Sequence, residues 1–98
     1  MLTRAEALEI VSGAIADINS GNLQAMVWEE HTVERDHVFA FLCNTKEYKE
    51  TGNPRHSLIG IGPIIVRRRT GAVVVCGNRT PWIESIDEYE RRAAAGDW

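Results

Sequence analysis

The residues with the most concentrated charge are three consecutive arginines at positions 67–69, between the apolar runs 63–66 and 72–75. Two short apolar runs joined by a Thr-Gly pair are typical of a β-hairpin, and Gly71 suits a turn position with positive φ. Because alternate strand residues point to opposite faces, we expect Arg67 and Arg69 to share one side and Arg68 to lie on the other.

This basic hairpin has two interpretations. Arginine is favoured at protein–protein contacts, so the cluster is a candidate binding patch, to which Arg79 adds a charge near the other end of the hairpin. Alternatively, the charge only keeps a sheet edge from aggregating. The residues themselves leave both interpretations open.

Other reactive residue types do not form a recognisable catalytic or metal site. The histidines at 31, 37 and 56 have no zinc-like spacing to the cysteines. Cys43 and His56 could be paired as a nucleophilic dyad, but Cys43 lies in an apolar run, which raises a thiol's pKa and makes it inert. We therefore expect Cys43 and Cys76 to be buried thiols, and we expect no catalytic residue, no metal and no cofactor.

The run Gly60-x-Gly62-Pro63 is similar to a phosphate-binding loop, but such a loop precedes a helix, and here a strand-like run follows. A tight turn into that strand is the simpler interpretation. The carboxylates near residue 30 and those of residues 84–90 are interpreted as solvated faces.

Composition describes an ordinary globular protein. The chain has 98 residues, of which 44% are hydrophobic and 26% charged, so we expect one domain over residues 1–98. The net charge of −3 argues against binding nucleic acid through bulk electrostatics. The sequence has no apolar run long enough to cross a bilayer and no signal-peptide pattern, which predicts a cytoplasmic protein without a membrane partner.

Periodicity predicts the elements that position these residues. Thr3 and Glu6 have capping-box spacing and begin a helix whose apolar stripe includes Val11 and Ile15. A second helix begins at Thr80-Pro81, with Thr80 as its cap. Strands are expected at 25–31, 38–43, 64–67 and 72–76, with 44–56 as a long loop. Residues 38–43 are apolar on both faces and suit a central strand.

These elements predict an α+β fold. In order, it contains an N-terminal helix, a four-stranded antiparallel meander and a C-terminal helix. Packing both helices on one face of the sheet gives two layers.

Several of these segments together resemble the YrhB-like family, which is also called immunity protein 35. The resemblance covers about residues 25–92, and its specific part is Gly60-x-Gly62-Pro63-Ile64-x-Val66 followed by Thr70-Gly71. More general matches are Val38–Phe41, Tyr48–Gly52 and the Tyr89-Glu90 pair of the terminal helix.

The resemblance implies a role in binding and no catalytic residues. Members of that family are small cytosolic bacterial proteins, many encoded beside polymorphic toxins that they are thought to neutralise by binding, and one branch is described as chaperone-like. This chain has Arg67 where the family usually has an acidic residue, and His37-Val38 near a position where it often has Trp. A more basic hairpin implies a locally acidic partner.

We therefore expect a non-enzymatic immunity protein that binds a cognate toxin, with a peptidase as one possible toxin class. The candidate contacts are Arg67, Arg68, Arg69 and Arg79 on the hairpin, Tyr48 and Arg55 in the long loop, and Glu29 and Glu30 on the first strand. Two alternatives stay open: a chaperone-like protein that binds unfolded chains, and a nucleic-acid binder that uses the basic hairpin. Monomer and homodimer are both compatible with the sequence.

Overall fold

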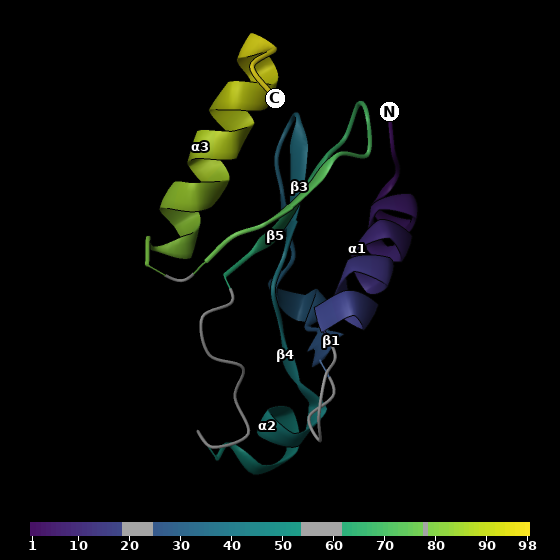
Figure 1. The fold of residues 1–98 in the computed structure, drawn as a ribbon, viewed down its shortest axis with the longest axis vertical. Helices are drawn as coiled ribbons and strands as arrows, with labels where there is room; N and C mark the ends of the chain where they lie inside the picture. Colours follow the sequence, from purple (N-terminus) through teal and green to yellow (C-terminus); the bar gives the residue numbers. More distant parts are fainter. Residues whose placement is uncertain (19–24, 54–61, 78) are drawn as a thin grey trace.

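The computed structural model describes residues 1–18, 25–53, 62–77 and 79–98 (Figure 1). Arg55, His56 and Gly60 lie outside these ranges. In chain order the elements are α1 (Arg4–Ile18), β1 (Ala25–Val27), the 3-10 turn η1 (Glu29–His31), β2 (Val33–Glu34), β3 (Val38–Phe41), β4 (Cys43–Thr45), α2 (Lys46–Thr51), β5 (Ile64–Arg67), β6 (Val73–Val75) and α3 (Trp82–Ala95). The predicted α+β class is confirmed.

The main sheet has the order β2-β3-β5-β6 with antiparallel neighbours, and β1 pairs separately with β4. The predicted first strand is therefore two strands. Val33 is six positions after Val27, whereas their partners Ala40 and Cys43 are only three positions apart. The three residues of η1 take up this difference, so the strand is interrupted and then resumes at the sheet edge.

The helices lie on opposite faces of the main sheet (Figure 1). Helix α1 packs on the face that contains Phe39, Phe41, Ile64 and Val66 through Ala7, Val11 and Ile15. Helix α3 packs on the other face, where Ile86 and Ala93 meet Val38, Ala40 and Ile65. The two-layer prediction is wrong. Strands β3 and β5 are apolar on both faces, and each face needs its own cover.

Helix ends follow local chemistry. The capping box of α1 is confirmed, since the Thr3 N–H donates to Glu6 Oε1 at 3.0 Å and the Glu6 N–H donates to Thr3 Oγ1 at 3.2 Å. The predicted Thr80 cap is wrong: Pro81 occupies the cap position, and α3 begins at Trp82. None of the helices in the described ranges has the length and apolarity that a bilayer crossing requires.

The predicted loop 44–56 contains α2, which the sequence interpretation missed. Its N-terminus is capped by Thr45, whose Oγ1 accepts a hydrogen bond from the Tyr48 N–H at 2.9 Å. Its C-terminus is closed by Gly52 with φ of 67°. A threonine cap followed seven residues later by a glycine was visible in the sequence and would have predicted this short helix.

Gly62 belongs to the scaffold. Its N–H donates to the Cys76 carbonyl at 2.7 Å, and a Cβ at this position would collide with the Gly77 carbonyl oxygen. Glycine is therefore needed because two backbone segments approach closely. Pro63 is buried and leads directly into β5, so a strand follows this segment, as the simpler interpretation requires.

Candidate partner-binding surfaces

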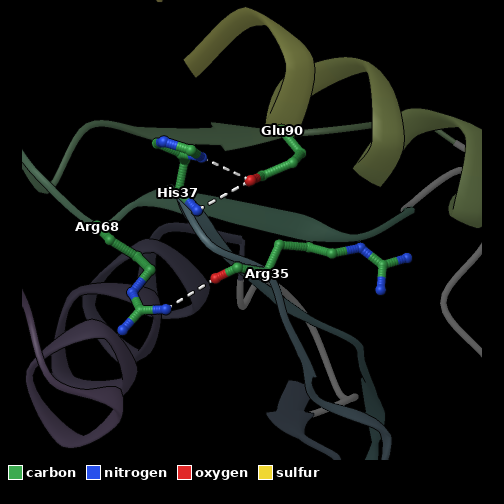
Figure 2. Close-up of polar contacts among 4 residues, drawn as sticks. All are labelled: Arg35, His37, Arg68 and Glu90. Atoms are coloured by element: carbon green, nitrogen blue, oxygen red, sulfur yellow. Dashed lines mark hydrogen bonds and ion pairs between the residues drawn. The ribbon is translucent and has the colours of Figure 1, made fainter. Parts of the chain in front are cut away.

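The three consecutive arginines separate as the strand alternation predicts. Arg68 lies on the α1 face, with its guanidinium 4.6 Å from the centre of the Phe39 ring. Its Nη1 donates to the Arg35 carbonyl at 2.8 Å (Figure 2). Its backbone N–H donates to the His37 carbonyl and its carbonyl accepts from the Leu2 N–H. Arg68 therefore joins the N-terminus, the β2–β3 turn and the end of β5.

Arg67 and Arg69 lie on the α3 side and line a concave hollow of about 600 Å³. The rest of the lining is formed by His37, Met1, residues 93–95 at the end of α3, and Gly96, which caps that helix. Among the described residues neither guanidinium has an ion-pair partner. Two cations at an open hollow are suited to carboxylates on another molecule, which a guanidinium can bind through two parallel hydrogen bonds.

One wall of this hollow is fixed by contacts between α3 and the β2–β3 turn. The Glu90 carboxylate accepts the His37 backbone N–H, with 3.0 Å to each oxygen, and Oε1 lies 2.7 Å from His37 Nδ1 (Figure 2). Asp87 pairs with Arg35 at 3.3 Å. The interpretation of residues 84–90 as a solvated face missed these contacts. No local spacing indicates them, since Glu90 and His37 are 53 residues apart.

Arg79 lies away from this hollow, beyond the far end of β6. It is exposed and borders a second hollow of about 360 Å³ between β6 and α3. Within that hollow Glu88 is neutralised by Arg92, at 2.9 Å. The hairpin therefore presents arginine at both of its ends, as its sequence predicts.

The acidic and aromatic candidates form a different cluster, around Trp28. The rings of Trp28 and Tyr48 lie 5.8 Å apart, and Lys49 Nζ lies 5.7 Å from the Trp28 ring centre. Lys49 also pairs with Glu30 at 2.9 Å, and this hydrogen bond lowers the pKa of Glu30. Glu29 is exposed, while its carbonyl accepts from Arg4. The charges here are largely satisfied within the protein.

The thiols are half-buried and free. Burial raises the pKa of Cys43, and burial together with the nearby Glu88 carboxylate raises that of Cys76, so both thiols are held in the unreactive protonated form. Within the described ranges, no three His, Cys, Asp or Glu side chains are arranged to hold a metal ion.

The structure thus brings Arg67 and Arg69 together, groups Tyr48 with Glu30, and leaves Arg79 apart. No curated protein and no solved structure matches this sequence. A family model does match: the one described as Immunity protein 35 covers residues 5–91. This range includes nearly all of the described elements and the arginine hairpin, and the chain belongs to the Immunity protein 35 family.

Proposed function

We propose that this chain neutralises a cognate toxin by direct binding, and that the hollow lined by Arg67 and Arg69 contacts the toxin. The family supports a role in immunity. The observation that carries the choice of surface is the pair of guanidinium groups, which lack ion-pair partners among the described residues and border a hollow of about 600 Å³.

The surrounding contacts favour this surface because they hold it in one shape. Arg68 clamps the hairpin from the α1 side, and Glu90 holds His37 from the α3 side. A hairpin and a turn that are already held in place lose little backbone freedom on binding, so more of the contact energy appears as affinity. Occluding a functional surface of the toxin, such as the cleft of a peptidase, requires no chemistry from this chain.

The test is a capture experiment from native-host lysate with three forms of the protein. Wild type is compared with the double variant Arg67→Glu, Arg69→Glu and with the charge-matched control Lys46→Glu, Arg91→Glu. Lys46 is exposed on α2 and Arg91 is exposed on α3. We expect wild type and the control to retain one stoichiometric protein partner, and the hairpin variant to lose it.

The captured protein is then expressed alone and with each form in a susceptible host. Growth arrest that is relieved by wild type and by the control, but not by the hairpin variant, is the expected result. Equal protection by all three forms would show that another surface binds the toxin. Retention of only nucleic acid, or of a mixture of unfolded chains, would favour the nucleic-acid or chaperone-like alternative over immunity.

A further inference from the structure

Among the strands that the structure describes, β6 lies at one end of the main sheet, and its outer edge is open. Its hydrogen bonds with the β5 side are made by alternate residues: the Arg67 N–H donates to the Ala72 carbonyl at 2.8 Å, and the Cys76 N–H donates to the Pro63 carbonyl at 3.0 Å. By the antiparallel pattern, Val73 and Val75 then direct their backbone N–H and C=O groups away from β5. Among the described strands none pairs with this outer edge.

The two sides of the open edge differ in character. Val73 and Val75, whose side chains lie on the α1 face, are 41% and 45% exposed, because α1 packs mainly against β3 and β5. On the opposite face lies the hollow of about 360 Å³ between β6 and α3, whose lining includes the apolar Val74, the aromatic Tyr89 and the polar Ser85 and Glu88. An added strand would therefore meet two exposed valines on one side and a groove of mixed polar and apolar lining on the other.

The charges near the two ends of β6 determine which kind of strand can pair with its outer edge. Arg69 and Arg79 are both exposed, and neither has an ion-pair partner among the described residues. Two copies of the protein could pair through this edge as antiparallel strands related by a two-fold axis at Val74. Val73 of one copy would then lie opposite Val75 of the other, and Arg69 of one copy would lie toward Arg79 of the other. Like charges so placed disfavour a second copy. An added strand with acidic residues at its ends would instead be attracted to both arginines.

We propose that β6 receives an extended segment of the cognate toxin as a fifth strand beside the existing four. The segment has carboxylates near both ends, which meet Arg69 and Arg79, and apolar residues at alternate positions, which cover Val73 and Val75. Backbone hydrogen bonds to the open edge supply affinity, and the alternate side chains supply specificity. The inference rests on the proposed function and adds how the toxin is held.

A synthetic peptide tests the edge without the toxin. The probe is acetyl-Glu-Ser-Thr-Val-Thr-Val-Thr-Ser-Glu-amide, added to the ¹⁵N-labelled protein while amide NMR shifts are recorded. We expect saturable changes that are largest at Val73, Val75 and Gly77. We also expect binding about fivefold weaker for the same peptide with lysine at both ends. Changes confined to other elements, no saturable change, or equal binding of the two peptides would overturn the proposal.

Variants at Val75 connect the edge to the toxin. Val75→Pro removes an outward N–H without touching the bonds to β5, and proline is tolerated in edge strands whose N–H faces outward. Val75→Thr keeps the N–H and is the matched control. We expect Val75→Pro to lose both the peptide and the captured toxin, and Val75→Thr to keep both. If Val75→Pro does not fold, the two-peptide titration of wild type still decides.

The outcomes separate the two proposals. Capture of the toxin by Val75→Pro at the wild-type level would refute strand addition and leave the proposed function standing. Binding of the acidic-ended peptide at β6 by a wild-type protein that captures no toxin would refute the proposed function and leave β6 as an edge that binds extended acidic peptides.

Discussion

The three consecutive arginines have different structural roles in this protein. Strand alternation predicted that Arg68 would lie opposite Arg67 and Arg69, and the structure confirms this. What Arg68 contacts could not be predicted, because the Arg35 carbonyl is 33 residues away and reaches it only after the sheet has formed. Local geometry is thus readable from the sequence, whereas the partner is a consequence of the fold.

Arg68→Ala is expected to lower the free energy of unfolding by about 1–2 kcal/mol, because it removes a hydrogen bond to the Arg35 carbonyl and a cation–π contact with Phe39. Arg69→Ala, at an exposed turn position, is expected to change it by less than about 0.5 kcal/mol. Urea denaturation followed by tryptophan fluorescence measures both. Equal losses for the two variants would contradict the different roles assigned to them.

Gly62→Ala is expected to destabilise the protein by about 1–3 kcal/mol, because the added methyl group would collide with the Gly77 carbonyl oxygen. Gly13→Ala is the matched control. Gly13 lies within α1 and has open space where a Cβ would be, so alanine should stabilise the helix by about 0.5–1 kcal/mol. Opposite shifts of the melting temperature are the expected result, and a shift of Gly62→Ala in the stabilising direction would refute the scaffold role.

At the scale of elements, the sequence predicted the order of helices and strands better than the layers. The two apolar faces of residues 38–43, which contain β3, were recognised, yet both helices were expected on one face, which would have left the other face exposed. Residues 64–66 of β5 are buried as well, and the two strands together require a helix on each side of the sheet. The break at η1 was not predictable, since it arises from a three-residue difference between two strand pairings.

Adjacent isoleucines in β5 test the layer arrangement. Ile64 lies in the α1 core and Ile65 in the α3 core with Ile86, and all three are fully buried. Ile64→Val and Ile65→Val should each lower the free energy of unfolding by about 0.5–1.5 kcal/mol. In a two-layer fold one of the two side chains would be exposed, and its substitution would have little effect. In an Ile86→Ala background only the Ile65→Val effect should change. Denaturation of the single and double variants measures this, and coupling of Ile86 to Ile64 instead would contradict the arrangement.

The start of α1 predicts an acid-dependent contribution to stability. The hydrogen bond from the Thr3 backbone N–H lowers the pKa of Glu6. Glu6 therefore stabilises the fold above the ordinary pKa of 4.5, and this contribution disappears as pH falls through the lower folded value. Wild type should exceed Glu6→Gln in stability near about pH 7 and match it near about pH 2.

Glu9→Gln, which removes a charge from α1 without touching the capping box, is the control for that experiment. Urea midpoints at the two pH values provide the comparison. A gap between wild type and Glu6→Gln that persists or widens in acid would contradict the assigned direction.

At the scale of the molecule, the candidate contacts are distributed over an elongated body of 40 × 26 × 22 Å. Arg67 and Arg69 lie at the hairpin end, whereas Tyr48 belongs to α2 at the opposite end (Figure 1). The sequence could nominate residues by type, but which of them share a surface depends on sheet register and on which face each helix covers. That is why the seven nominated residues within the described ranges do not make one site.

The separation predicts how salt acts on complex formation. Cations at one end of a protein with net charge −3 steer an acidic partner toward that end, and salt screens this attraction. With the purified toxin, the wild-type association rate constant should fall about tenfold between low and physiological ionic strength. For the Arg67→Glu, Arg69→Glu variant, the association rate constant should already be small at low salt and should not fall further as salt is added. Tyr48→Ala should keep the wild-type slope, because its ring packs on Trp28 at the other end. Stopped-flow mixing over a range of sodium chloride concentrations measures how the association rate constant depends on salt. No salt dependence for wild type, or a weaker dependence for Tyr48→Ala than for wild type, would indicate that the toxin contacts a surface other than the hairpin.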